Sequence, residues 1–75
     1  MTLTEGKIGC VYQVERLQVK ETVTRRLEAL GVNEQTKITI LNNKRNGSTI
    51  IRVRGTRLAL GRLITDGIFI KEVQG

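Results

Sequence analysis

Few side chains in this sequence could carry out acid–base or nucleophilic chemistry. The chain contains no His, the most common proton carrier of enzymes, so its single cysteine, Cys10, has no His to activate it. The seven carboxylates are scattered, and local spacing brings no two together: Glu5, Glu15, Glu21, Glu28, Glu34, Asp66 and Glu72. The sequence therefore predicts no catalytic residues, and we expect the protein not to be an enzyme.

Residues for metal or cofactor binding are also scarce. Zinc and other borderline metals are usually held by His or by several Cys residues, which this chain lacks. Gly55 and Gly61 follow neither common spacing of a phosphate-binding loop and are better explained as turn glycines. Cys10 is most simply interpreted as a small buried apolar residue. We therefore predict no metal site and no cofactor.

The charge of the chain is more informative. Lys and Arg number 13 against 7 Asp and Glu, which gives a net charge of +6 over 75 residues. Such an excess attracts an anionic partner, whether a nucleic acid, an anionic lipid surface or an acidic protein surface, although it also keeps a small domain soluble. Nucleic acid is the less well supported of these, because the only aromatic residues, Tyr12 and Phe69, are not interleaved with the basic clusters as stacking platforms.

Length and terminal sequence suggest the class of protein. A chain of 75 residues is expected to form one domain, 1–75, that buries about 60% of the surface its unfolded chain exposes. No segment approaches the roughly 20 apolar residues of a membrane-spanning helix, and the first residues lack the pattern of a signal peptide. A lone cysteine fits a reducing compartment. We expect a cytoplasmic protein that is not inserted into a membrane.

The basic side chains must be positioned by backbone elements, and a hairpin over residues 51–60 is the best defined of these. Gly55 can adopt φ > 0, as the first central position of a type II′ turn requires, so Gly55 and Thr56 are predicted to form the turn. This register sets apolar residues opposite one another on one face, in the pairs Val53–Leu58 and Ile51–Leu60. The arginines then project from the other face: Arg52, Arg54 and Arg57, with Arg54 opposite Arg57.

A strand and a helix are predicted before this hairpin. Imperfect alternation predicts a bent strand over residues 8–17, with Gly9 permitting a bulge or a close backbone approach. Its inward side chains would be Ile8, Cys10, Tyr12 and Val14. From Lys20 the apolar spacing becomes helical, and the helix is expected to end at Gly31, with Thr22 as its candidate N-cap. Its apolar side chains are Val23, Leu27 and Leu30.

The remaining segments complete a small β fold. A strand over residues 36–41 is expected to place Ile40 opposite Ile51, which requires a loop wider than a tight Asn46–Gly47 turn. A single helical turn over residues 61–67 and a last strand over residues 68–73, with Ile68 and Ile70 inward, follow the hairpin. The expected fold is mainly β: a five-stranded barrel with one α-helix after the first strand and a short helical turn before the last, because closure would remove the edges of so small a sheet.

Three blocks of this sequence resemble the FeoA family. They are Arg25-Arg26-Leu27-Glu28-Ala29-Leu30-Gly31-Val32, the segment 50–61 with its Arg-Gly-Thr-Arg-Leu-Ala-Leu-Gly run, and Gly67-Ile68-Phe69-Ile70. The resemblance runs from about Gly6 to Val73, and the order and spacing of the blocks make it specific. The chain departs from the family pattern at Gln35, where the family usually has a turn Gly, and at Thr65, where it usually has Ala.

The resemblance implies an SH3-like barrel and an accessory or regulatory role in bacterial ferrous iron uptake. The partner that it implies is the membrane ferrous iron transporter, contacted through its cytosolic GTPase domain. A related barrel appended to iron-dependent repressors serves in protein contacts. A small nucleic-acid-binding barrel is the alternative function, a metal-binding carrier is a more distant one, and weak homo-oligomerisation remains open.

The expected partner-binding surface is the outward face of the hairpin and its neighbours. It comprises three arginines with two apolar residues on the same exterior: Ile50, Arg52, Arg54, Arg57 and Phe69. Arg and aromatic residues are enriched at protein interfaces, where electrostatics mainly sets the rate of association. Solvated arginines on a barrel wall are the simpler alternative, since single exposed charges usually contribute little.

Overall fold

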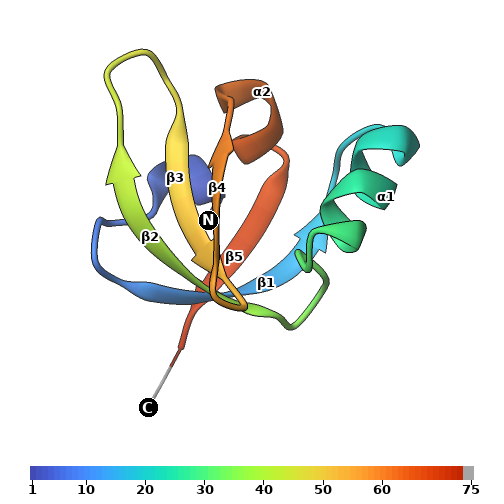
Figure 1. Cartoon of the computed structure of the whole chain (residues 1–75), viewed down its shortest axis with the longest axis horizontal. Coiled ribbons are helices and arrows are strands. Elements are labelled where there is room, and N and C mark those ends of the chain that lie inside the picture. Colours follow the sequence, from blue (N-terminus) through green and yellow to red (C-terminus); the bar gives the residue numbers. More distant parts are fainter. Residues whose placement is uncertain (74–75) are drawn as a thin grey trace.

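One antiparallel sheet organises the chain, and the computed structural model describes it over residues 1–73 (Figure 1). Its five strands lie in the order β4-β3-β2-β1-β5. The elements along the chain are a 3₁₀ turn η1 (Leu3–Glu5), β1 (Val11–Leu17), α1 (Glu21–Ala29), β2 (Lys37–Asn43), β3 (Thr49–Val53), β4 (Thr56–Leu60), α2 (Arg62–Thr65) and β5 (Ile68–Glu72). The expected mainly β fold is confirmed, with a main helix after the first strand and one helical turn before the last.

The core is built from alternate residues of the strands, together with Leu3 of η1, Leu27 of α1 and Val32 of the connection after α1. Successive side chains of a strand point to opposite faces, so every second residue faces inward. The fully or nearly buried apolar residues are Leu3, Tyr12, Val14, Leu27, Val32, Ile38, Ile40, Ile51, Val53, Leu60, Ile68 and Ile70. The inward positions predicted for residues 36–41 and 68–73 are confirmed.

The hairpin forms where the sequence predicts it, but the predicted register is wrong by two residues. Val53 lies opposite Thr56, and the other inward-facing pairs are Ile51 with Leu58 and Thr49 with Leu60. The central turn residues are therefore Arg54 and Gly55, with φ of 51° and 79°, as in a type I′ turn, whose twist matches that of the strands. A shift of two residues preserves which side chains face inward, so Arg52 and Arg57 still face outward, now opposite each other.

The first strand is shorter than predicted. Gly9 has φ of 85° and lies in a turn in which the Cys10 N–H donates to the Lys7 carbonyl at 3.2 Å. This turn leaves Ile8 and Cys10 exposed, so their predicted burial is wrong. The bulge lies instead at Glu15, where the register of β1 against β5 shifts between Val14 and Arg16.

The helix α1 ends as predicted and begins without a side-chain cap. Gly31 has φ of 96°, its N–H donates to the Glu28 carbonyl at 3.0 Å, and the Val32 N–H donates to the Leu27 carbonyl at 2.8 Å. This pair of bonds is the Schellman arrangement that a glycine after the last turn permits. The residue at the N-cap position is Lys20 and not Thr22, because the helix begins at Glu21. Leu27 is buried, whereas Leu30 is 43% exposed and contributes little to the core.

The connection between β2 and β3 confirms the wider loop. Ile40 lies opposite Ile51, and the register then shifts by one residue at Leu41 before Asn43 pairs with Thr49. The Lys44 N–H donates to the Ser48 carbonyl at 2.8 Å, which closes the loop. Pairing of buried isoleucines therefore outweighs the local preference of Asn46–Gly47 for a tight turn.

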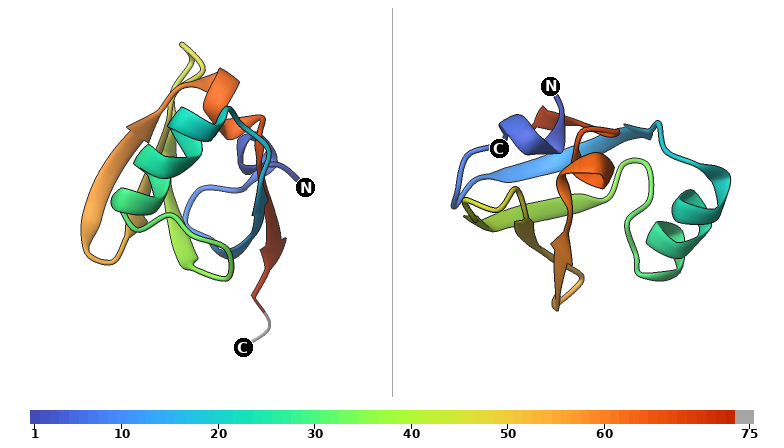
Figure 2. Two further views of the ribbon diagram at one scale, coloured as in Figure 1. Left: turned by 90° about the vertical axis from the view of Figure 1, so that its right-hand side faces the viewer. Right: turned by 90° about the horizontal axis from the view of Figure 1, so that it is seen from above.

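The two edges of the sheet differ. The outer edge of β5 is covered by the start of the chain, since Thr2 forms a bridge with Phe69 and the Ile70 N–H donates to the Met1 carbonyl at 2.8 Å (Figure 2). Within residues 1–73 no ladder joins β4 to β5, so the expectation that closure removes both edges is wrong. None of the helices in residues 1–73 has the length and apolar character needed to cross a membrane.

Candidate interaction surface

Basic side chains from four strands share the outer face of the sheet. In one row across the sheet, Arg57 of β4 lies opposite Arg52 of β3, and Arg52 lies opposite Thr39 of β2, which in turn pairs with Val11 of β1. A second row runs Lys37–Gln13–Lys71 across β2, β1 and β5. We call the exposed cations of these two rows the outer basic face; they are Lys37, Arg52, Arg57 and Lys71.

Within residues 1–73, no ion pair neutralises a cation of the outer basic face. The two ion pairs formed within residues 1–73 join Arg25 to Glu21 at 2.7 Å and Arg62 to Asp66 at 3.8 Å, both within helical segments. Neither pair involves a residue of the outer basic face. Arg52 and Arg57 in addition face each other as like charges, an arrangement that is mildly unfavourable in a sheet. The face therefore presents positive potential to any approaching molecule.

The predicted partner-binding residues are only partly brought together. Ile50, Arg52 and Arg57 lie on the outer side of the β3–β4 hairpin, with Ile50 half-buried opposite Ala59. Phe69 lies on β5 at the other end of the sheet, under the Arg16 guanidinium, whose Cζ is 4.3 Å from the ring centroid. Phe69 is therefore engaged within the chain and is separated from β3 by β1 and β2.

Arg54 lies in the hairpin turn, where its side chain lies against the end of α1. A Cβ built on Gly31 would lie 3.2 Å from Arg54 Cδ. Cations are stabilised near helix C-termini by the helix dipole. Arg54 therefore has a structural role beside α1 in addition to any role in binding.

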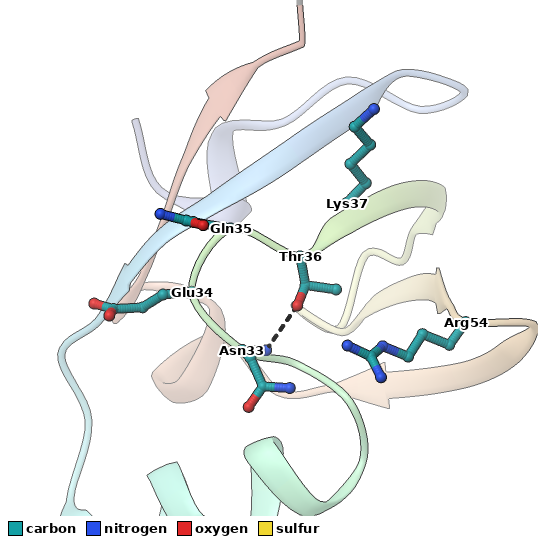
Figure 3. Close-up of a pocket in the computed structure, with 6 residues that line it drawn as sticks. All are labelled: Asn33, Glu34, Gln35, Thr36, Lys37 and Arg54. Carbon is teal, nitrogen blue, oxygen red and sulfur yellow. Dashed lines mark hydrogen bonds between the residues drawn. The ribbon is translucent and has the colours of Figure 1, made fainter.

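An open hollow adjoins the outer basic face at this end of the molecule. Figure 3 shows the Arg54 side chain reaching toward Asn33 and Thr36, whereas Glu34 points away from it. The hollow has a volume of about 680 Å³ and is lined by Asn33, Glu34, Gln35, Thr36, Lys37 and Arg54. Because both Lys37 and Arg54 line it, the hollow extends the positive surface toward the hairpin turn.

Gln35 in this hollow adopts a backbone conformation that favours glycine. Its φ is 72°, and its backbone is fixed from both sides, since its N–H donates to the Val14 carbonyl at 2.6 Å and its carbonyl accepts from Gln13 Nε2 at 2.9 Å. Within residues 1–73, the non-glycine residues with positive φ are Gln35 and Arg54. Both of them line this hollow.

An apolar groove lies between α2 and the start of α1, and no residue of the outer basic face lines it. It has a volume of about 580 Å³ and is lined by Gln18, Val19, Lys20, Val23, Leu63 and Ile64. Leu63 is 92% exposed, the most exposed of the large apolar residues described. The outward position of Leu63 was not predictable from the sequence, because a four-residue helical turn has no periodicity from which an outward apolar residue can be recognised.

Lys37 and Lys71 were not predicted as members of the basic surface. The signal was present, because both alternate with inward isoleucines in strands that the sequence predicts correctly. Their proximity depends on both β2 and β5 pairing with β1, which alternation within one strand does not reveal. Residues 1–73 contain no group of three or more His, Cys, Asp or Glu side chains that could hold a metal ion, and Cys10 is free and exposed.

Comparison with known proteins places the chain in a family. The family model of the FeoA domain matches residues 1–72. The solution structure of the FeoA protein from Chlorobium tepidum has a TM-score of 0.91 at 28% identity, with all of this chain covering 72% of that chain. The crystal structure of an iron uptake regulatory protein (FeoA) has a TM-score of 0.86 at 22% identity, covering 97% of this chain and 96% of that one.

A cadmium-bound protein shares the fold over part of its length. In the crystal structure of ScaR with bound Cd²⁺, the match has a TM-score of 0.87 at 22% identity and covers 97% of this chain but 35% of that chain. No curated protein sequence matches the chain. The fold is thus the SH3-like barrel of these proteins, as expected from the sequence. With the family model matching nearly the whole chain, the protein belongs to the FeoA family.

Proposed function

We propose that this protein is a cytoplasmic accessory or regulatory module of ferrous iron uptake, and that it acts by binding another protein and not by catalysis. Membership of the FeoA family supports the role in ferrous iron transport. The partner we propose is the membrane ferrous iron transporter, met through its cytosolic GTPase domain. The proposed function is assigned to the single domain 1–75.

The observation that carries the proposed mode of action is the outer basic face. Four exposed cations from four strands have no ion-pair partner within residues 1–73, and two of them, Arg52 and Arg57, face each other. The repulsion between these like charges decreases when an acidic surface of a partner covers them. Such charge complementarity raises the association rate and disfavours the binding of basic proteins. The half-buried Ile50 lies beside Arg52 and supplies apolar contact area.

The test is a binding measurement with matched charge reversals. Arg52→Glu with Arg57→Glu should weaken binding of the transporter's cytosolic domain at least about tenfold, since rim charges of this kind set the association rate. Lys44→Glu with Arg45→Glu makes the same change of charge on the exposed β2–β3 loop and is the control. Binding should also weaken as salt rises, because exposed charges are screened.

The outcomes separate the proposed function from its alternatives. An equal loss of binding in the two double variants would show that binding depends only on the net charge of the protein. Unchanged binding in a folded Arg52→Glu, Arg57→Glu protein would remove the face from the interface. Loss of binding to a single-stranded oligonucleotide, with no binding of the cytosolic domain by the unmodified protein, would establish the nucleic-acid alternative instead.

A further inference from the structure

The free edge of the sheet is β4. The opposite edge, β5, is bonded to the start of the chain through the Met1 carbonyl and the bridge between Thr2 and Phe69. Residues 56–60 pair with β3 and form no backbone hydrogen bond to any other described segment. β4 and β5 are the two ends of the strand order, and in the left view of Figure 2 β4 (orange) lies at one side of the molecule and β5 (dark red) at the other.

The register of the hairpin identifies which backbone groups of β4 are unpaired. In an antiparallel ladder, pairs that exchange both hydrogen bonds alternate with pairs that exchange none. The two-residue turn makes Val53 and Thr56 the first exchanging pair, so Leu58 is bonded to β3 and Arg57 and Ala59 are not. The N–H and C=O groups of Arg57 and Ala59 therefore point away from β3, and both residues are exposed.

This edge lacks the usual structural protection against strand pairing. Proteins commonly block an edge with proline, with a bulge or with a cover of other chain segments. The sequence has no proline, and the β3–β4 register is unbroken from Thr49–Leu60 to Val53–Thr56, whereas the β1–β5 and β2–β3 ladders are each interrupted. The remaining protection is the charge of Arg57 beside Arg52. That charge repels a second copy of this basic chain but attracts acidic residues.

We propose that the β4 edge accepts an extended acidic segment of a partner protein as a sixth strand. The backbone of that segment bonds to the N–H and C=O groups of Arg57 and Ala59, as in other cases of strand addition. Its outward side chains are acidic and lie beside Arg57 and Arg52, and its inward side chains are apolar and cover the half-buried Leu58. This mode of binding does not depend on a role in iron uptake, and its test needs no transporter.

The test uses the full chain and a synthetic peptide of alternating Glu and Val, of about eight residues. Amide hydrogen exchange is followed by NMR. In the free protein, the amides of Arg57 and Ala59 exchange much faster than those of Thr56 and Leu58. With saturating peptide, exchange at Arg57 and Ala59 slows at least about tenfold while Thr56 and Leu58 change little, because only the outward amides gain a partner.

Two modified reagents distinguish strand addition from charge attraction. N-methylation of the peptide at the residues that donate to β4 should abolish the protection, whereas N-methylation at the alternate residues should leave it intact. Ala59→Pro removes an edge donor without removing a bond to β3, a position where proline is tolerated. This variant should bind the peptide at least about tenfold more weakly. If this variant does not fold, the comparison of the two N-methylated peptides still distinguishes strand addition from charge attraction.

Three results would overturn the proposal. Equal binding of the two N-methylated peptides would show that the backbone of the peptide is not recognised. Protection of Arg57 and Ala59 in the free protein at high concentration, with dimerisation, would make a second copy the occupant. Binding of a single-stranded oligonucleotide as tight as that of the peptide, without protection of these amides, would leave only an electrostatic surface.

Discussion

The hydroxyl oxygens of Thr4 and Thr65 lie 2.7 Å apart, although 61 residues separate them in the chain. Thr65 is fully buried, and its hydroxyl oxygen also lies 3.2 Å from the Arg62 carbonyl oxygen. This contact joins the 3₁₀ turn at the start of the chain to α2. Thr65, a departure from the family pattern, therefore has a structural explanation within this chain.

Thr65→Val should lower the free energy of unfolding by about 1 kcal/mol, because a buried hydroxyl and its hydrogen bonds are replaced by a methyl group of similar size. Urea unfolding gives the value. Thr56→Val at the exposed start of β4 is the control, with a change within about 0.5 kcal/mol. Equal effects of the two substitutions would show that the Thr4–Thr65 contact does not stabilise the fold.

Leu27→Ala should cost about 2 to 5 kcal/mol, because Leu27 is 2% exposed and no other residue of α1 is buried. A domain of this size has a total stability near 5 kcal/mol, so the variant should be partly unfolded at room temperature. Leu63→Ala makes the same chemical change at a residue that is 92% exposed and should alter stability by less than about 0.5 kcal/mol. Thermal melts followed by circular dichroism compare the two, and similar melting temperatures would contradict the packing described for α1.

Gln35→Gly should stabilise the protein by about 1 kcal/mol. A non-glycine residue in the left-handed region costs of order 1 to 3 kcal/mol, which exceeds the added chain entropy of glycine in the unfolded state. The backbone bonds of Gln35 to Val14 and Gln13 do not require its side chain and would be retained. Glu34→Gly, at an adjacent residue without positive φ, should be destabilising in the same urea experiment. Destabilisation by Gln35→Gly would mean that the side chain makes a contribution larger than the strain.

The Glu5 carboxylate should make stability depend on pH in the acid range. The Thr2 backbone N–H donates to Glu5 Oε1 at 2.7 Å and the Thr2 hydroxyl at 3.2 Å, and these bonds lower the pKa of Glu5 below its ordinary value. A carboxylate whose pKa is lower in the folded than in the unfolded state stabilises the fold at any pH above its unfolded-state pKa. This contribution to stability is lost as the pH falls through the folded-state pKa. Glu5→Gln should therefore flatten the pH dependence of the melting temperature in the acid range. Identical pH profiles for the two proteins would exclude this linkage.

Alternation predicted which side chains face inward but not how strands are aligned. In the hairpin, both possible turns contain Gly55, and the choice between them depends on whether Arg54 adopts φ > 0. Sequence rules disfavour that conformation for arginine, yet it allows the type I′ turn and places the side chain of Arg54 against Gly31. The error in register was two residues, so the outward faces of Arg52 and Arg57 were still predicted correctly.

The candidate surface was predictable only within a single hairpin. Ile50, Arg52 and Arg57 share a face because they belong to adjacent strands with a short connection. The position of Phe69 at the far end of the sheet, and the arrival of Lys37 and Lys71 beside Gln13, depend on the strand order, which is set by contacts between distant segments. The predicted burial of Ile8 and Cys10 was wrong for a local reason: the turn at Gly9 ends the alternating strand pattern before it reaches these two residues.

Arg57→Glu should raise stability while reducing binding, and this opposition tests the interaction surface most directly. Replacing one arginine of the Arg52–Arg57 cross-strand pair converts a repulsion into an attraction, which is expected to add about 0.2 to 1 kcal/mol to the free energy of unfolding. Arg57→Gln removes the repulsion without creating an attraction and should be intermediate in both stability and binding. Stability is measured by urea unfolding, and binding is measured with the cytosolic domain of the transporter. A like-charge pair retained at a cost to stability is expected where function requires it. If Arg57→Glu instead gained stability and bound as well as the unmodified protein, Arg57 would be a solvated side chain of the barrel wall.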